Sequence, residues 1–499
     1  MEVSATMRNY LLCALCFPVL LCAQDLKEFE KNVTEFDLPN GMHFIVLERH
    51  QAPVVSFYAH VNSGSTDDPG GKSGLAHMFE HMIGKGTAAI GSKDWNFEKK
   101  ELEAVEEAYD RLEAERGKGP RADASKVERL QGLLKSQIDK ANRYVEPNAY
   151  IRTIEENGAV GFNASTSQDF TNYFYSLPSN RAELWFLLQS SWFKRPIFRE
   201  FYKERDVVRD ERRMRVESSP QGKVQEMLLA TAFAAHPYRN LVGWASDIEN
   251  LRATDAEAFF KMHYVPGNIT VSMAGDITAA DAKKFAQKYF APIPAGPPPR
   301  RLNIVEPKQE GEKRVSVVSS AQPFLLIGYK RPSDLDKDDP AFDVLSSILS
   351  SGRTSIIYKE LVRDKKLALG AATVATLPAG RHPHLFAFIS VPSAGHTIEE
   401  SEKAWYEIID RLKKEPVDKA TLERTKVKLR AGLIRQLDSN SGLASELAQY
   451  YATYGNWRKM FTGLEEIEKV TAEDVQRLAN QYFDASNRTV AFTVKGDTK

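Results

Sequence analysis

A long internal repeat is the sequence feature that most restricts the fold of this chain. Residues 247–271 align with residues 466–490 without a gap. Both copies contain the sequence Asn-x-Thr-Val, which starts at Asn268 in the first copy and at Asn487 in the second. A match of this length within one chain indicates that a structural unit has been duplicated. The sequence therefore predicts two α+β domains of similar topology.

A proline-rich segment separates the two copies. Residues 292–299 read Pro-Ile-Pro-Ala-Gly-Pro-Pro-Pro, a composition that excludes both helix and sheet. We expect an N-terminal domain over residues 24–290, a linker over residues 291–312 and a C-terminal domain over residues 313–499. Each domain is expected to be an α/β sandwich, in which helices cover a mixed, mostly antiparallel sheet. The 499 residues, of which 42% are hydrophobic, suffice for two cores.

Residues 97–145 carry helical periodicity on both sides of a break at residues 117–120, which read Gly-Lys-Gly-Pro. Apolar side chains recur every three or four positions on each side, with Glu and Lys between them. The pattern predicts an amphipathic helical hairpin inserted into the N-terminal domain. Such a hairpin either packs on the body of the domain or forms an arm that contacts a partner.

The first 23 residues have the features of a secretory signal peptide. Arg8 precedes an apolar run from Tyr10 to Leu21, and the small residue Ala23 follows. A run of this length is shorter than the ~20 residues that span a membrane, which disfavours an anchor. A lipoprotein signal at Cys22 is the weaker alternative, since a small residue is normally wanted before that cysteine. We therefore expect export to the periplasm or secretion, with no membrane span after signal removal.

All three cysteines, Cys13, Cys16 and Cys22, lie inside this signal segment. The exported chain would then hold no disulfide and no thiol nucleophile, and a metal would need histidine and carboxylate ligands. The 67 Lys and Arg residues balance the 67 Asp and Glu residues. Zero net charge argues against nucleic acid as a partner, because phosphate binding requires a basic surplus.

The strongest chemical motif is formed by His77, Glu80 and His81. On a helix, histidines four residues apart leave the same face one turn apart and can converge on one ion. Glu80 lies on that face too, in a position to hold a metal-bound water. This is the H-x-x-E-H pattern of the inverted zincins.

A catalytic zinc usually has three protein ligands and one open position, so a third ligand is required. The highly charged helical segment over residues 199–217 offers candidates. Glu204 and Glu211 are seven residues apart and share a helix face, and either could bind the metal. Glu200 and Asp210 are further possibilities. The plain alternative is a solvated face of salt bridges.

The H-x-x-E-H motif together with the segment Glu-Arg-Asp-Val-Val-Arg-Asp-Glu, which ends at Glu211, resembles the pitrilysin/insulinase family of zinc metallopeptidases. The likeness is to its bacterial, exported, processing-peptidase-like branch. The resemblance implies one Zn²⁺ per chain, held by His77, His81 and Glu211. It further implies that Glu80 is the general base and that Glu204 supports the site without binding the metal.

Residues 161–178 resemble the substrate-side edge strand of that family. The resemblance implies substrate-binding roles for Asn163, Ala164, Ser165 and, in the C-terminal domain, Arg353. The family pairs that arginine with a tyrosine, whose position here is occupied by Leu369. Leu369 weakens the expectation that the chain grips substrate unaided.

We therefore expect an exported zinc endopeptidase that cleaves unfolded peptides, with Glu80 activating a zinc-bound water. The alternatives are a non-catalytic peptide-binding or assembly subunit of a two-chain peptidase, and a domain stabilised by structural zinc. Each half of the larger family members resembles this whole chain. A partner is therefore expected, either a second copy or a family subunit that lacks the metal motif.

Overall fold

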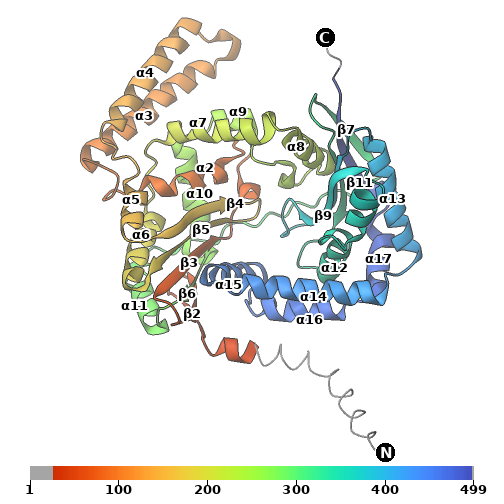
Figure 1. Cartoon of the computed structure of the whole chain (residues 1–499). Helices are drawn as coiled ribbons and strands as arrows, with labels where there is room; N and C mark the ends of the chain where they lie inside the picture. The colour runs from red at the N-terminus through yellow and green to blue at the C-terminus, as the bar shows by residue number, and fades with distance from the viewer. Residues whose placement is uncertain (1–25, 497–499) are drawn as a thin grey trace, which may run out of the picture.

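The computed structural model describes residues 26–496, so the signal peptide expected over residues 1–23 lies outside the described part. The described chain forms two sheets, of six and five strands, each with helices packed on it (Figure 1). Both sheets are mixed and mostly antiparallel. The expected α+β architecture is confirmed.

The first sheet has the order β1-β2-β6-β3-β5-β4. Its strands are β1 Val33–Asp37, β2 His43–Glu48, β3 Val54–Val61, β4 Val160–Thr166, β5 Thr171–Pro178 and β6 Ile269–Gly275. Only β2 and β6 run parallel. The tight turn between β1 and β2 depends on Gly41, whose φ of +92° suits a residue without a side chain. Strand β4 lies at the edge of the sheet, so one side of its backbone is unpaired by the sheet.

The second sheet has the order β7-β11-β8-β10-β9. Its strands are β7 Lys313–Val318, β8 Leu325–Arg331, β9 Ala368–Leu377, β10 His384–Pro392 and β11 Arg488–Val494. The two sequence repeats form equivalent helix–strand units, α10 (Ala253–His263) with β6 and α17 (Ala472–Tyr482) with β11. In both, the repeated asparagine donates a hydrogen bond to a carbonyl at the helix end, from Asn268 to His263 and from Asn487 to Tyr482. This local contact gives the repeated asparagine a structural role.

In each half of the chain, one helix packs on the sheet of the other half. Helix α8 (Pro220–Ala232) packs on the second sheet, where Leu228 contacts the cluster that includes Leu326. Helix α15 (Asn440–Tyr454) packs on the first sheet beside β6 and β3, and Leu447 joins the cluster around Ile45 (Figure 1). The faces left open by one half are thus buried by the other half.

The opposite face of the first sheet carries an aromatic core. Trp185 and Trp192 of helix α6 (Ala182–Lys194) are fully buried there, as is Phe79 of helix α2 (Leu75–His81). The large aromatic side chains of Trp185, Trp192 and Phe79 fix α2 against the sheet.

Other helices of the described chain are α5 Ala149–Glu156, α7 Phe201–Arg212, α9 Ala245–Glu249, α11 Ala279–Tyr289, α12 Asp339–Ser350, α13 Ile398–Lys414, α14 Lys419–Gln436 and α16 Lys459–Lys469.

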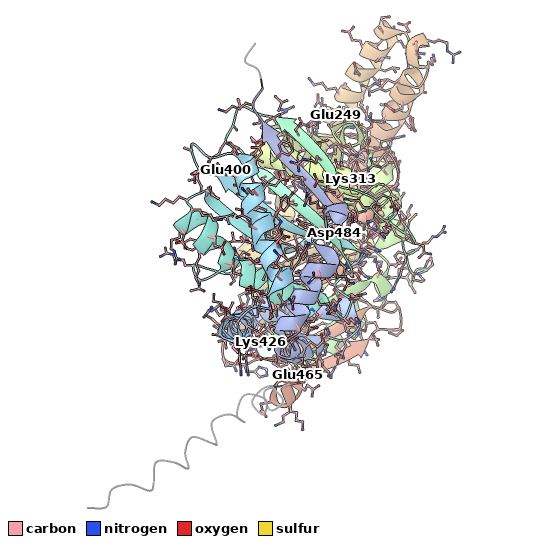
Figure 2. The ribbon with its side chains drawn as sticks, turned by 90° about the vertical axis from the view of Figure 1, so that its right-hand side faces the viewer. Glu249, Lys313, Glu400, Lys426, Glu465 and Asp484 are labelled. Atoms are coloured by element: carbon pink, nitrogen blue, oxygen red, sulfur yellow. The ribbon has the colours of Figure 1, made fainter. Side chains whose placement is uncertain are left out.

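The expected helical hairpin is present as α3 (Trp95–Arg116) and α4 (Ala124–Asn142). It projects from the body in both views, with its tip pointing away (Figures 1 and 2). The inner side of α3 is anchored by Tyr109, which stacks on Tyr202 of α7 with ring centroids 5.3 Å apart. The hairpin is therefore packed at its base and along α3, and it stands free at its tip.

The second half contains elements that the sequence did not predict. Helix α12 ends at a turn containing Gly352 at φ +74°, and a π-helical turn, Tyr358–Asp364, follows. Strand β9 and helices α15 and α16 were not anticipated. Residues 291–312, the expected linker, contain no helix or strand.

Within residues 26–496, no helix has both the length and the apolar character needed to cross a bilayer.

Candidate metal centre

Helix α2 is short, and contacts made before its first residue hold it in place. The carboxylate of Asp68 accepts backbone N–H bonds from Gly74 at 2.7 Å and from Ala76 at 2.8 Å. Gly74 has a φ of +91°, which turns the chain sharply into the helix. Because Leu75 and Phe79 point into the core, the opposite face turns His77, Glu80 and His81 toward a cleft.

Helix α7 brings the acidic residues to the same cleft. Arg199, two residues before the first residue of α7, is buried and pairs with Glu98 of α3 at 2.8 Å. The guanidinium of Arg199 also donates to the carbonyls of Lys85, Thr87 and Ile90 in the loop that follows α2. One buried arginine therefore ties together the hairpin, the loop after α2 and the start of α7.

His77, His81 and Glu211 form one compact group. Oε2 of Glu211 lies 3.7 Å from Nε2 of His77 and 3.4 Å from Nε2 of His81. One ligand atom from each residue lies within 4.8 Å of the others. Donors at about 2.0–2.1 Å around a tetrahedral ion are spaced by roughly 3.3 Å, and two imidazoles with one carboxylate are a common zinc set. The three side chains therefore fit a zinc ion.

Glu204 contacts the imidazole of His81 at the ring nitrogen that does not face Glu211. Its Oε2 lies 3.5 Å from Nδ1 of His81, and its Oε1 lies 2.5 Å from Nζ of Lys85. Burial lowers the pKa of His81, but hydrogen bonds with Glu204 and Glu211 outweigh it and raise the pKa to about 9. A carboxylate on the far ring nitrogen orients a ligand histidine and increases its basicity.

Within residues 26–496, Glu80 forms no ion pair, although the charges of His81, Glu211 and Arg215 act on its carboxylate. Burial raises its pKa, and a hydrogen bond with Thr166 of β4 acts in the opposite direction. A carboxylate whose pKa is raised toward neutrality is better suited to accept and release a proton. His77 differs from His81, because burial lowers its pKa to about 4 and so favours the neutral imidazole that a metal requires.

Lys85 and Arg215 belong to this site and were not anticipated from the sequence. Arg215 Nη1 lies 2.6 Å from Glu211 Oε1, the oxygen that does not face the histidines. Both have a sequence signal in retrospect: Lys85 follows the motif by one helical turn, and Arg215 is four residues after Glu211.

His77, His81 and Glu211, which we call the metal group, lie in a cleft of about 720 Å³ between α2, α7 and the edge strand β4. Asn163, Ala164 and Ser165 line this cleft, next to Glu80 and His77. The structure thus brings the strand expected to bind substrate alongside the residues expected to bind metal. Asn163, Ala164 and Ser165 pair with β5 on one side only, because β4 is the last strand of its sheet.

The other two residues singled out for substrate contact lie elsewhere. Arg353 is exposed in the turn after α12, and Leu369 is 63% exposed at the start of the edge strand β9. Neither lines the cleft around His77. The structure does not bring Arg353 to the metal group within one chain.

Two family models match this chain. The model described as insulinase (peptidase family M16) matches residues 137–243, and the model described as the peptidase M16 inactive domain matches residues 250–429. Together they match more than half of the chain. His77 and His81 lie before residue 137 in the sequence and so outside the matched residues. All of α3 and most of α4 separate them from the start of the match.

Proteins with similar sequences are named as peptidases of this type. The zinc protease PqqE of Helicobacter pylori is 27% identical over 470 residues, which cover 91% of each protein. A probable mitochondrial-processing peptidase beta subunit of Arabidopsis thaliana is 22% identical over 460 residues, 89% of this chain and 75% of that protein.

Solved structures share the fold. A protease from Helicobacter pylori superposes with a TM-score of 0.76 at 24% identity, covering 93% of this chain and 99% of that one. The periplasmic protease PqqL from Escherichia coli superposes with a TM-score of 0.66 at 14% identity, covering 94% of this chain but 48% of that one. With both family models matched in order along its length, the chain belongs to the M16 (insulinase) family of peptidases.

Proposed function

We propose that this protein is an exported, zinc-dependent endopeptidase that cleaves unfolded peptides. The observation that carries the proposal is the convergence of His77, His81 and Glu211 within 4.8 Å, with Glu80 beside them and outside their ion pairs. A structural zinc site is normally closed by four ligands and has no use for an extra carboxylate. This arrangement therefore favours a catalytic site over a structural one.

The side chains have distinct roles in the proposed reaction. Zinc, when bound, supplies a Lewis acid that activates water and polarises the scissile carbonyl. Glu80 takes the proton of the attacking water and passes it to the leaving amine. Glu204 and Lys85 hold the ring of His81 in its ligating orientation, and Arg215 holds Glu211 through its second oxygen.

The edge strand β4 supports a preference for extended substrates. A peptide that adds to a free strand edge is held by main-chain hydrogen bonds, so varied side chains are accepted. Asn163, Ala164 and Ser165 would lay such a peptide across the cleft, close to Glu80. Folded proteins cannot present a free strand in this way, which is why unfolded peptides are the proposed substrate class.

We further propose that the active form is a dimer in the periplasm or outside the cell. The residues that line the cleft around His77 all lie between Ser65 and Val242, and this chain covers 48% of the larger protease PqqL. A partner would enclose the substrate and exclude competing water. The partner is a second copy or a family subunit without the metal motif. Measurement of the molecular mass in solution at micromolar concentration tests the dimer. N-terminal sequencing of the protein from fractionated cells tests export, and we expect a start near Gln24.

A non-catalytic subunit is the second candidate, favoured by the match of residues 250–429 to a domain described as inactive. One experiment separates the two. The purified mature chain is analysed for metal and then incubated with a casein-derived unstructured peptide, with and without chelator. Zinc near one per chain and chelator-sensitive cleavage support the peptidase. Zinc without cleavage, alone or mixed with candidate partners, would favour the subunit.

A further inference from the structure

A second cavity lies where the hairpin meets the body of the protein. It measures about 430 Å³, within the range of roughly 300–1,000 Å³ typical of small-ligand sites. It shares no lining residue with the cleft around His77. We call it the hairpin cavity. Its apolar wall is built from Trp95, Leu102, Ile138, Ile197, Phe198 and Phe260.

The wall is assembled from four separate parts of the chain, one of which is the segment with Ile197 and Phe198 between α6 and α7. Trp95 and Leu102 come from α3, Ile138 comes from α4, and Phe260 comes from α10. Ala141 of α4 also lines the cavity and is buried. Apolar side chains from both hairpin helices therefore face apolar side chains of the body across the cavity, where an apolar group would make dispersion contacts with both.

The carboxylates that line the hairpin cavity all have partners. Glu103 pairs with Lys99 and Glu257 pairs with Lys261, both across one helical turn. Glu106 accepts a hydrogen bond from Tyr202, and Glu200 pairs with Lys85 and Lys203. These contacts use the lining cations Lys99 and Lys261.

Two further lining cations have no such contact. Lys194, the last residue of α6, and Arg195, which follows it, are both exposed and line the cavity. Within residues 26–496, neither side chain has an ion-pair or hydrogen-bond partner. The cavity therefore combines an apolar interior with two edge cations, Lys194 and Arg195, that have no ion-pair partner in the described part of the chain, and this combination matches an anion on an apolar chain.

We propose that the hairpin cavity binds a small amphipathic carboxylate, of the medium-chain fatty-acid class. The chain would lie among Leu102, Ile138 and Phe260, and the carboxylate would meet Lys194 and Arg195. The wall also includes Glu200 and Phe201, at the start of the helix that carries Glu211. A ligand at this position touches the metal-bearing helix from the side away from the cleft.

Titration of the full mature chain with sodium decanoate, below its micellar concentration, tests the proposal by calorimetry. We expect saturable binding of one decanoate per chain. Decyltrimethylammonium has the same chain and the opposite charge, and it should bind at least about tenfold more weakly, since hydrogen bonds to a charged group are lost. Equal binding of the two probes would overturn the proposal.

Two variants locate the site. The double substitution K194A/R195A should weaken decanoate binding by about tenfold or more. The matched double substitution R129A/K419A removes one exposed arginine and one exposed lysine elsewhere and should change nothing. Ala141→Phe fills the cavity and should abolish binding, provided that its circular dichroism spectrum is native. Because K194A/R195A alters only exposed side chains, the proposal stays falsifiable if A141F fails to fold.

The same titration on the metal-stripped chain separates this proposal from the peptidase proposal. Decanoate binding should be unchanged without metal, since no metal-binding residue lines the hairpin cavity. Binding that persists in an inactive chain supports the cavity whatever the enzyme does. Absence of saturable binding, or equal binding by K194A/R195A and R129A/K419A, would refute it.

Discussion

Glu204 and Glu211, two turns apart on α7, meet the ring of His81 at its two different nitrogens. Glu211 faces Nε2 at 3.4 Å, on the side shared with His77, and Glu204 faces Nδ1 at 3.5 Å. An imidazole that binds a metal through one nitrogen can donate a hydrogen bond through the other. We therefore propose different roles for the two carboxylates, Glu211 as a metal ligand and Glu204 as a group that orients the His81 ring.

Replacing these two carboxylates should therefore have different effects. We expect Glu211→Ala to lose its zinc. Glu204→Ala should keep zinc at micromolar metal, with affinity reduced by about 10–100-fold and activity lost. Metal analysis of the dialysed variants is the measurement. Asp206→Ala, on the exposed side of the same helix, is the control and should behave as wild type. The reverse pattern would show that Glu204 is the ligand.

Glu80→Gln should abolish peptide cleavage while leaving zinc bound. The amide keeps the shape of the side chain and cannot accept the proton, so the rate should fall by about 100-fold or more. Turnover is measured on a metal-replete sample whose zinc content is determined in parallel. Near-normal turnover in that sample would assign the base to another group.

Lys85 and Lys203 offer a matched pair, because both contact Glu200 but only Lys85 contacts Glu204. Lys85 is 14% exposed and Lys203 is 63% exposed. Lys85→Met should lower zinc affinity and kcat by about tenfold, since Glu204 loses the partner that fixes it. Lys203→Met should leave both near wild type. Equal effects of the two substitutions would mean that Lys85 acts only through Glu200.

Two buried histidines predict a loss of stability in acid. Burial, aided by Arg381 near His60 and by Arg331 near His384, lowers the pKa values of both histidines from 6.5 to about 3. Between these values the unfolded chain binds more protons than the folded chain. The free energy of unfolding should therefore fall as the pH drops below about 6.5, by about 1.4 kcal/mol per pH unit for each extra proton.

Urea unfolding of the metal-free chain at several pH values between 7.5 and 4 measures this slope. His60→Gln should reduce the slope of the unfolding free energy against pH by the contribution of one proton. The control is His50→Gln, because hydrogen bonding with Asp276 raises the pKa of the exposed His50. His50→Gln should not flatten the acid slope, and a similar flattening in both variants would show that His60 is not the source.

Features set by local sequence were the ones that could be predicted. His77, Glu80 and His81 share a helix face whatever surrounds them, and the repeat around Asn268 and Asn487 encodes a contact within a few residues. The two-domain α+β fold followed from the internal repeat and the hairpin from helical periodicity, and both were confirmed. The roles of the site residues remain predictions.

Features set by distant contacts could not be predicted. Strand β9 is rich in alanine, so its extended form depends on pairing with β10 more than on intrinsic preference. Helix α15 packs on strands that lie about 170 residues or more before it in the sequence. No local sequence pattern predicts contacts over such a separation. Lys85 was missed for the same reason, because Glu204 reaches it only in the folded chain.

The reciprocal placement of α8 and α15 makes the covalent link between the two halves dispensable for holding them together. If a protease cut the proline-rich segment 292–299, each fragment would still have one of its helices seated on the sheet of the other. Separation would bare two hydrophobic faces at once, around Leu228 and around Leu447. The nicked protein should therefore migrate as a single particle under native conditions and as two pieces only after denaturation.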